Sequence, residues 1–551
     1  MTRILIILIS IISLHSFKTY AQKEGDKLPY LKHKNGRHAL FVDDEPYLIL
    51  GAQCNNSSAW PETLPKVWSA MEKLHINTLE IPIYWEQFEP QQNKYDYSVI
   101  NTIITQAREH NIRLVLLWFA TWKNGSNHYM PQWMKQQPDK YFNMVDKNGN
   151  TIDSPSPHAQ ATLHADIKAF SAFMEHLKAF DKQQTVIMVQ VQNEPGAWGS
   201  VRDYSKLAEK IFNQPVPNKV LKAAKKSPKL NNNWTDVFGK NADEFFQAWH
   251  VASYIGKVAE AGKAIYPIPL YVNAAIRNPI NPGPPYYQVG GPNDNVFELW
   301  KAAAPAVDLL APDIYFSDPK VYLKVLEVYS RTDNPLFIPE TFWHDDYTKF
   351  FYSALHHGAI GYAPFGLDDK RIRLGKDGTK LTEKDMYHPT AINYKLFKPM
   401  ARTIAKLNFE GKIKTAVQLN KIDSLSPRGN AFDRVNYLTD KTLHFENWDI
   451  DIAFGLFTRL SRTKYQPKLA DGRLLAAKLN DNQFLLAGYH SRVMFKPTGK
   501  NKGKQWQYLV VEEGHYENGK FKPDRILNGD QTDWGLVFDT PKLLRVTVYT
   551  R

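Results

Sequence analysis

The feature that most constrains the fold is a long alternation of short apolar runs and longer amphipathic stretches between Leu40 and Phe409. The short runs predict buried strands and the longer stretches predict helices, which together form repeated βα units. The strand candidates are Tyr47–Gly51, Asn77–Tyr84, Arg113–Trp118, Val186–Gln192, Leu270–Asn273, Leu309–Ile314, Leu336–Ile338 and Ala359–Ala363. Eight βα units over roughly 370 residues predict an α/β fold of the (β/α)8 TIM-barrel type, with large loops.

An open, doubly wound sheet is the alternative fold for such an alternation. That fold binds dinucleotides through a glycine-rich loop after a strand. None of the strand candidates is followed by such a loop, and the chain has no HExxH or CxxC motif. We therefore favour the barrel and expect neither a metal nor an organic cofactor.

Beyond Phe409 the pattern changes to short alternating runs separated by Gly, Asn, Asp and Pro, which predict a smaller all-β, sandwich-like domain. These runs are Thr415–Leu419, Thr442–Phe445, Phe484–Tyr489, Gln507–Val511 and Leu543–Thr550. We assign residues 22–410 to the catalytic barrel and 411–551 to the β-sandwich. Two roles stay open for this second domain, polysaccharide binding and support of the barrel.

The first residues have the layout of a secretory signal peptide. A basic start at Met1–Arg3 precedes the apolar run Ile4–Leu14, and cleavage is expected after Ala21, so the signal peptide is residues 1–21. A membrane anchor is the alternative, but eleven apolar residues fall short of the ~20 needed to span a bilayer. The single cysteine, Cys54, excludes an internal disulfide, which favours a bacterial periplasmic or exported protein.

The chain is basic, with 69 Lys and Arg against 56 Asp and Glu. A basic balance attracts nucleic acid or acidic polysaccharide. Here the positive residues are scattered, apart from one modest cluster formed by Lys222, Lys225, Lys226 and Lys229. Because the chain is expected to be secreted, we predict no nucleic-acid partner. The sequence does not indicate the oligomeric state.

Two glutamates stand where a barrel places its functional residues, at the C-terminal ends of strands. Glu194 follows the fourth strand candidate, and Glu340 follows the seventh. A single such glutamate can instead cap a helix or pair with a buried arginine. Two of them face each other across the barrel mouth, as glycoside hydrolysis requires. The pair therefore predicts a glycoside hydrolase.

The surroundings of these glutamates resemble a known group of enzymes. Asn193-Glu194 after strand four and Glu340 after strand seven resemble the clan A glycoside hydrolases. Several motifs are similar to glycoside hydrolase family 35, the β-galactosidases, in a bacterial branch with a C-terminal β-domain. They are Gly51-Ala52-Gln53, Trp85-Glu86-Gln87-Phe88-Glu89-Pro90, Val189-Gln190-Val191-Gln192-Asn193-Glu194, Leu117–Gly125 and Ala311–Phe316.

This resemblance implies a retaining mechanism with Glu194 as acid/base and Glu340 as nucleophile. Asn193 is expected to bind the sugar 2-OH, and Tyr315 to donate a hydrogen bond near Glu340. Many family-35 members have a sugar-binding glutamate where this chain has Thr121, which predicts a less charged subsite. The candidates for stacking on sugars are Trp122, Trp198 and Trp343.

The expected partner is an oligosaccharide with a terminal β-galactose, cut from the plant cell wall. The resemblance to the branch with a C-terminal β-domain implies side chains of xyloglucan as the leading natural substrate. The long loops Lys123–Gln132 and Asn278–Pro292 are compatible with a branched leaving group. Two alternatives stay open. One is another clan A activity, such as a β-glucosidase, β-mannosidase or endo-glycanase. The other is a non-catalytic glycan-binding protein of the cell envelope.

Overall fold

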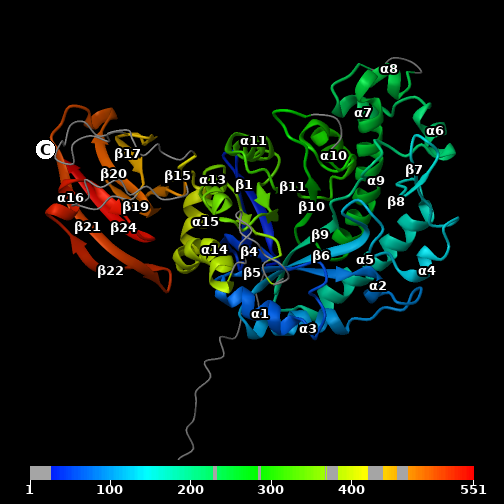
Figure 1. The fold of residues 1–551 in the computed structure, drawn as a ribbon, viewed down its shortest axis with the longest axis horizontal. Helices are drawn as coiled ribbons and strands as arrows, with labels where there is room; N and C mark the ends of the chain where they lie inside the picture. The colour runs from blue at the N-terminus through cyan, green and yellow to red at the C-terminus, as the bar shows by residue number, and fades with distance from the viewer. Residues whose placement is uncertain are drawn as a thin grey trace, which may run out of the picture.

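The computed structural model describes residues 27–227, 232–282, 287–366, 368, 382–419, 439–455 and 470–551. The predicted signal peptide lies outside these residues. No helix among them has the length and apolar character to cross a membrane. Figure 1 shows two parts, a larger one of helices around a sheet and a smaller one built from strands.

A parallel sheet forms the centre of the larger part. Its strand order is β12-β14-β4-β5-β6-β9-β10-β11-β13. The bounds are β4 Ile49–Gln53, β5 Thr78–Tyr84, β6 Arg113–Lys123, β9 Val186–Asn193, β10 Leu270–Ala275, β11 Leu309–Ile314, β12 Phe337–Ile338, β13 Glu340–Thr341 and β14 Gly361–Tyr362. The two edge strands, β12 and β13, are halves of one segment interrupted by Pro339, which lacks the N–H that a ladder needs. The sheet thus closes on itself, and the predicted barrel is confirmed.

Helices cover the outside of this barrel because each buries one apolar face against the strands. The longer ones are α1 Leu64–Lys73, α3 Ser98–Glu109, α5 Gln160–Phe180, α9 Ala242–Ile265, α11 Pro319–Tyr329, α14 Glu383–Phe397 and α15 Ala401–Phe409. The shorter ones are α2 Trp85–Phe88, α4 Gln132–Lys135, α6 Lys206–Phe212, α7 Asn218–Ala223, α8 Trp234–Phe238, α10 Phe297–Ala303, α12 Asp345–Thr348 and α13 Phe350–His356. A small hairpin, β7 Asn143–Val145 with β8 Thr151–Pro155, lies in the loop after β6.

An N-terminal antiparallel sheet, which the sequence analysis did not predict, packs against α15. Its strands are β1 Tyr30–Lys34, β2 Arg37–Val42 and β3 Glu45–Tyr47. The β1–β2 turn is Asn35-Gly36, and both residues have positive φ, at 51° and 74°. Asn-Gly is the favoured sequence for such a two-residue turn.

The C-terminal part is confirmed as an all-β domain of two sheets. One has the order β15-β18-β19-β24-β21-β22 and the other β16-β17-β20-β23. The bounds are β15 Ile413–Val417, β16 Lys441–His444, β17 Trp448–Phe454, β18 Arg473–Lys478, β19 Gln483–Tyr489, β20 Ser491–Pro497, β21 Trp506–Glu517, β22 Lys520–Leu527, β23 Leu536–Phe538 and β24 Lys542–Thr550, with the short helix α16 Asp530–Asp533. Trp448, Phe484 and Phe495 lie in the core between the sheets.

This domain also packs directly on the barrel. Leu475, Leu485 and Leu543 belong to the same apolar cluster as the barrel core. Thr415 donates a hydrogen bond of 2.8 Å to the carbonyl oxygen of Tyr352 on α13. The contact therefore continues the barrel core rather than linking two separate bodies.

Candidate active site

Glu194 stands directly after β9, on a strained turn. Both Gln192 and Glu194 have positive φ, at 69° and 44°, which is uncommon for residues other than glycine. Two contacts hold this turn. The backbone N–H of Glu194 donates to Oδ1 of Asn273 at 2.8 Å, and the Gln192 side chain donates to Asp166 at 2.5 Å. The turn therefore places the Glu194 carboxyl in a fixed position at the barrel mouth.

Glu340 is the first residue of β13 and follows Pro339. Its buried carboxyl accepts hydrogen bonds from three side chains on different strands or loops. Tyr315 donates its hydroxyl at 2.7 Å, Gln53 its amide at 2.9 Å, and Asn193 its amide at 3.3 Å. These three donors hold the buried carboxyl of Glu340 in one orientation.

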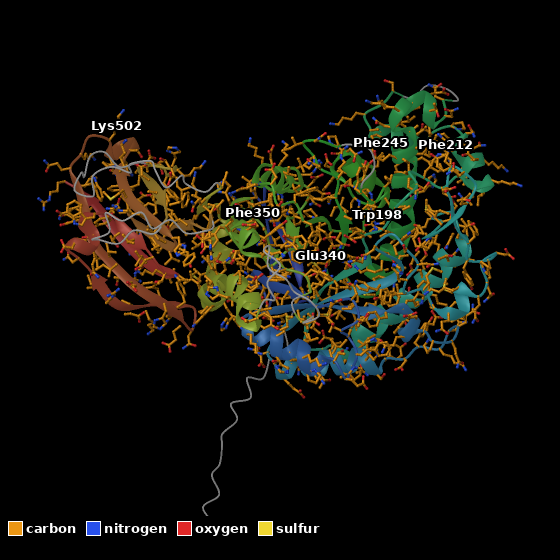
Figure 2. All side chains as sticks on the ribbon, viewed as in Figure 1. Trp198, Phe212, Phe245, Glu340, Phe350 and Lys502 are labelled. Atoms are coloured by element: carbon orange, nitrogen blue, oxygen red, sulfur yellow. The ribbon has the colours of Figure 1, made fainter. Side chains whose placement is uncertain are left out.

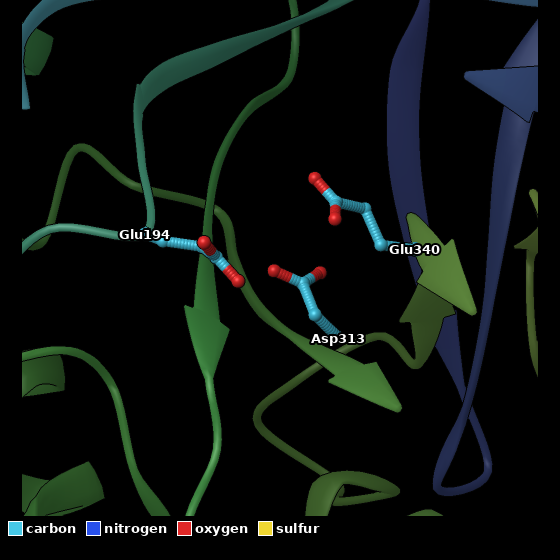
Figure 3. A group of neighbouring side chains, drawn as sticks. All are labelled: Glu194, Asp313 and Glu340. Carbon is cyan, nitrogen blue, oxygen red and sulfur yellow. The ribbon is translucent and has the colours of Figure 1, made fainter. Parts of the chain in front are cut away.

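A third carboxyl, that of Asp313 on β11, completes the group. Glu194, Asp313 and Glu340 each offer one oxygen, and these atoms all lie within 4.8 Å of one another (Figure 3). Retaining glycosidases place their two carboxyls about 5–5.5 Å apart, whereas inverting ones leave about 6.5–9.5 Å for a water. The spacing of Glu194 and Glu340 therefore fits the retaining arrangement.

Oxygens grouped in this way can also bind a cation. Here a buried cation of the chain lies beside them, because the ammonium of Lys123 donates to the side-chain oxygens of Asn193 at 2.8 Å and Asn124 at 2.5 Å. Burial raises the pKa of both Glu194 and Asp313, and the charge of Lys123 partly opposes this rise. The group already has a local positive charge, which favours an acid–base role over a metal centre.

The surroundings raise the pKa of two of these carboxyls, those of Glu194 and Asp313. Burial, and next the negative charge of Glu340, raise the pKa of Glu194 to about 7, against the smaller opposing effects of Lys123 and a hydrogen bond with Asp313. Burial and the charges of both glutamates raise the pKa of Asp313 well above its usual range. Glu194 is therefore protonated in mildly acid solution, as a general acid must be.

A pocket of about 350 Å³ opens onto Glu194 and Asp313. Its lining residues are Asn124, Glu194, Trp198, Ala275, Ile276, Tyr287, Asp313, Tyr315 and Phe316. The carboxyl groups of Glu194 and Asp313 therefore lie beside aromatic and aliphatic walls. A larger cavity of about 650 Å³ lies between α11, α13 and β15–β16, and none of the three carboxyls lines it.

Several residues predicted from the sequence come together here. Asn193 and Tyr315 contact Glu340, and Trp198 lines the pocket with 47% of its surface exposed (Figure 2). The amide of Asn193 also contacts Lys123 and Gln190. Trp343, the other stacking candidate, is not among the residues that line this pocket. It is only 8% exposed and stacks on His344, with ring centroids 4.3 Å apart.

Two residues that the sequence predicts to bind sugar, Thr121 and Trp122, lie in the core instead. Thr121 and Trp122 are completely buried. Thr121 donates to Asp166 at 2.7 Å, and the Trp122 ring packs edge-on against Tyr254. The physical reason is that β6 continues to Lys123, beyond its predicted end at Trp118, so both residues belong to the core. Thr121 therefore does not form a less charged sugar subsite, and Trp122 does not offer a stacking face.

Sequence reasoning also missed four residues of the site, which are Gln53, Lys123, Asn273 and Asp313. Each is a polar residue on a buried strand, and such a residue needs a buried partner. That signal was available for Gln53, Lys123 and Asp313, since all three lie inside motifs that carry the resemblance.

Comparison with known proteins bears on this site. Residues 54–249 match the model of glycoside hydrolase family 42, described as "Beta-galactosidase". This segment, which includes Glu194, is therefore similar to the β-galactosidases that the model describes. The matching model is that of family 42, so the family-35 resemblance is not confirmed. Residues 390–539 match a model described as "Domain of unknown function (DUF5597)".

Similar proteins carry the same description. "Beta-galactosidase 14" of Arabidopsis thaliana is 27% identical over 212 residues, which is 36% of this chain and 21% of that protein. "Beta-galactosidase 11" of the same plant is 23% identical over 20% of this chain and 13% of that protein. The chain thus matches about a fifth or less of these relatives. A β-galactosidase structure from Bacillus circulans sp. alkalophilus is 17% identical with a TM-score of 0.47, covering 65% of this chain and 57% of that one.

Proposed function

We propose that the protein is a retaining, exo-acting β-galactosidase of the family-35 branch that its motifs resemble. The observation that carries this proposal is the pair formed by Glu194 and Glu340. Their oxygens lie within 4.8 Å, the pKa of Glu194 is raised to about 7, and Glu340 is held by three donors. This is the division of labour between acid and nucleophile that retaining glycoside hydrolysis uses.

The proposed reaction has two steps. Glu340 attacks the anomeric carbon while Glu194 gives its proton to the departing oxygen, so that a covalent glycosyl–enzyme ester forms. The ester removes the negative charge of Glu340, which is one cause of the raised pKa of Glu194. The pKa of Glu194 then falls, and its carboxylate takes a proton from the water that cleaves the ester. Tyr315 and Gln53 keep the Glu340 carboxyl oriented for the attack.

The pocket supports an exo-acting enzyme. A volume of about 350 Å³ suits one sugar ring near the carboxyls, and the exposed face of Trp198 offers a surface for the leaving group. A β-glucosidase, a β-mannosidase or an endo-glycanase uses the same two glutamates with different pocket contacts. A panel of nitrophenyl β-glycosides tests the choice, and we expect the galactoside to have the highest kcat/KM. A higher value on the glucoside or mannoside contradicts the galactosidase assignment.

We further propose xyloglucan side chains as the natural substrate. The aromatic rim formed by Trp198, Tyr287 and Phe316 suits the xylose and glucose beyond the scissile bond. The test is kcat/KM on galactosylated xyloglucan oligosaccharides against lactose and β-1,4-galactobiose. Each ~1.4 kcal/mol of added transition-state binding gives about a tenfold preference. Equal values on lactose and the branched oligosaccharide favour a general β-galactosidase instead.

We also propose that the enzyme acts in the bacterial periplasm or outside the cell. This proposal rests on the basic, apolar N-terminal segment and on the single cysteine. Fractionation of cells that produce the full chain tests it. Activity is expected in the periplasm or the medium, with the mature chain starting at Gln22, and activity confined to the cytoplasm contradicts the proposal.

A further inference from the structure

We propose that Asp313 is a positioning residue that stays protonated and donates a hydrogen bond to Glu194. This inference rests on the proposed function, because it concerns how Glu194 works as acid/base. Three features support it: an oxygen of Asp313 that receives no hydrogen bond from the described residues, the side chain of Asn273, and the charges around Asp313.

Asp313 is only 2% exposed, so its carboxyl oxygens need partners within the protein. One of them, Oδ2, accepts a hydrogen bond of 2.7 Å from the Asn273 amide. The other, Oδ1, is buried, and none of the described residues gives it a hydrogen-bond donor. Figure 3 shows the carboxyl groups of Asp313 and Glu194 directed at each other. A proton on Asp313 turns this contact between two acceptors into a hydrogen bond.

Asn273 on β10 fixes the geometry of this contact. Its Oδ1 accepts the backbone N–H of Glu194 at 2.8 Å, and its Nδ2 donates to Asp313 at 2.7 Å. One side chain therefore holds both the turn that carries Glu194 and the carboxyl of Asp313. Because Asn273 donates to Oδ2, the proton of Asp313 is left to Oδ1.

The local charges favour a proton on Asp313. Three ionised carboxyls within 4.8 Å repel one another strongly in a buried site. Glu340 already has three donors, so Glu194 and Asp313 are the groups that hold protons. The charged and titratable groups that face Asp313 from the surrounding elements are Glu194, Glu340, Lys123, Tyr271, Tyr315 and Tyr329. Lys123 is the cation among them, and one positive charge balances the single negative charge of Glu340.

This arrangement assigns Asp313 a defined task in the proposed reaction. When the proton of Glu194 moves to the departing oxygen, the new carboxylate of Glu194 accepts a hydrogen bond from Asp313–H. That bond stabilises the carboxylate without adding a second negative charge. Asp313 itself gains and loses no proton over the cycle, so the proton balance of hydrolysis is unchanged.

Infrared difference spectroscopy tests this proton without using activity. At ~pH 8, above the pKa of about 7 of Glu194, the carbonyl band of protonated carboxyls is compared among four full-length proteins. The wild type, Glu194→Gln and the control Asp318→Asn should show the same band, and Asp313→Asn should lose part of it. Asp318 is exposed in the loop that follows β11, at the N-cap of α11, where asparagine is also a good cap. Burial raises the pKa of Glu80 as well, and its carbonyl band contributes equally to the spectra of all four proteins. An unchanged band in Asp313→Asn overturns the proposal.

The pH profile of kcat/KM gives a second test. Asparagine keeps a neutral N–H donor toward Glu194, so Asp313→Asn should leave the alkaline limb of the profile within about 0.3 pH unit of wild type. Asp313→Ala removes the donor, so the limb should move to higher pH and kcat should fall about tenfold or more. A limb lowered by about one unit in Asp313→Asn means that Asp313 is ionised, which overturns the proposal. If the wild type cleaves no β-galactoside, the proposed function fails. The infrared comparison still shows whether Asp313 is protonated.

Discussion

At the scale of single residues, the site separates two chemically identical side chains by their surroundings. Glu340 accepts hydrogen bonds from Tyr315, Gln53 and Asn193. Glu194 is held mainly through its backbone, and its carboxyl lines the pocket beside Asp313. The first arrangement suits a nucleophile, and the second suits a group that must gain and lose a proton.

The two glutamates should therefore fail differently when truncated. Glu340→Ala should abolish turnover of every substrate, because no covalent intermediate forms. Glu194→Ala should slow substrates with poor leaving groups far more than activated aryl glycosides, which need little protonation. Azide should restore turnover of an activated substrate by Glu194→Ala. Steady-state kinetics on both substrate types checks this, and equal losses in both variants would show that the roles are wrongly assigned.

The pH dependence should follow Glu194. Because its pKa is raised to about 7, the acid form is lost as the pH rises, and kcat/KM should fall on the alkaline side with an apparent pKa near that value. The same shift affects stability. Glu194 binds its proton more tightly in the folded protein than in the unfolded chain. Its contribution to the free energy of unfolding is therefore complete below about pH 4.5 and is lost as the pH rises through about 7. Glu194→Gln should remove this part of the pH dependence of Tm, and an unchanged slope would contradict the shift.

The sequence was informative where function placed a charge at the end of an apolar run. Glu194 and Glu340 were found in this way, and the eight strands of the barrel follow from the same pattern. Asn273 and Lys123 were missed because their partners, Asp313 and Asn193, lie on other strands and only the closed barrel brings them together. Thr121 was misread because nothing in the apolar run shows that β6 continues to Lys123.

At the scale of elements, the segment after β9 depends on a close approach to the loop after β10. Ala197 and Val289 pair in an isolated antiparallel bridge. Gly196 has φ 124°, and a Cβ there would lie 2.5 Å from the carbonyl oxygen of Val289. Gly199 in the same loop has φ 77°, with nothing within 4 Å of a Cβ. Both glycines therefore have positive φ, but only Gly199 has room for a Cβ atom.

Alanine substitutions at these glycines should separate strain from collision. Gly199→Ala should cost about 1 kcal/mol of stability with little change in kcat. Gly196→Ala should cost about 2 kcal/mol or more and should lower kcat, because the backbone next to Glu194 must move. Thermal unfolding and kinetics of the two variants measure this. Similar effects at both positions would contradict the close approach.

The C-terminal domain shows where pattern reading stops at the element scale. Its five predicted runs correspond to β15, β16, β19, β21 and β24. The other strands of the domain were not predicted from the sequence; they are β17, β18, β20, β22 and β23. In β22 most residues are exposed, so the alternation that reveals a half-buried strand is absent. The N-terminal sheet was missed although Asn35-Gly36 marks its first turn.

At the scale of the whole molecule, the two parts share apolar core and hydrogen bonds. Leu475, Leu485 and Leu543 lie in the barrel's apolar cluster, and buried Arg473 donates to Asn393 of α14 at 2.9 Å. This contact supports a buttressing role for the C-terminal domain. It also predicts that the barrel does not unfold separately from the sandwich.

Calorimetry of the full chain should therefore show one cooperative transition. Leu485→Ala should lower the stability of the whole protein by about 2–5 kcal/mol, because it leaves a cavity in the shared core. Removal of residues 411–551 should leave the barrel insoluble. Two separate transitions, with only one of them shifted by Leu485→Ala, would contradict this coupling.

The central claim is that Glu194 and Glu340 act as the acid/base and the nucleophile of a retaining β-galactosidase. The most direct measurement is proton NMR of the sugar released in the first moments of hydrolysis of a β-galactoside, before the anomers equilibrate. β-Galactose is expected as the first product, because two successive inversions at the anomeric carbon restore its configuration. α-Galactose as the first product would contradict it.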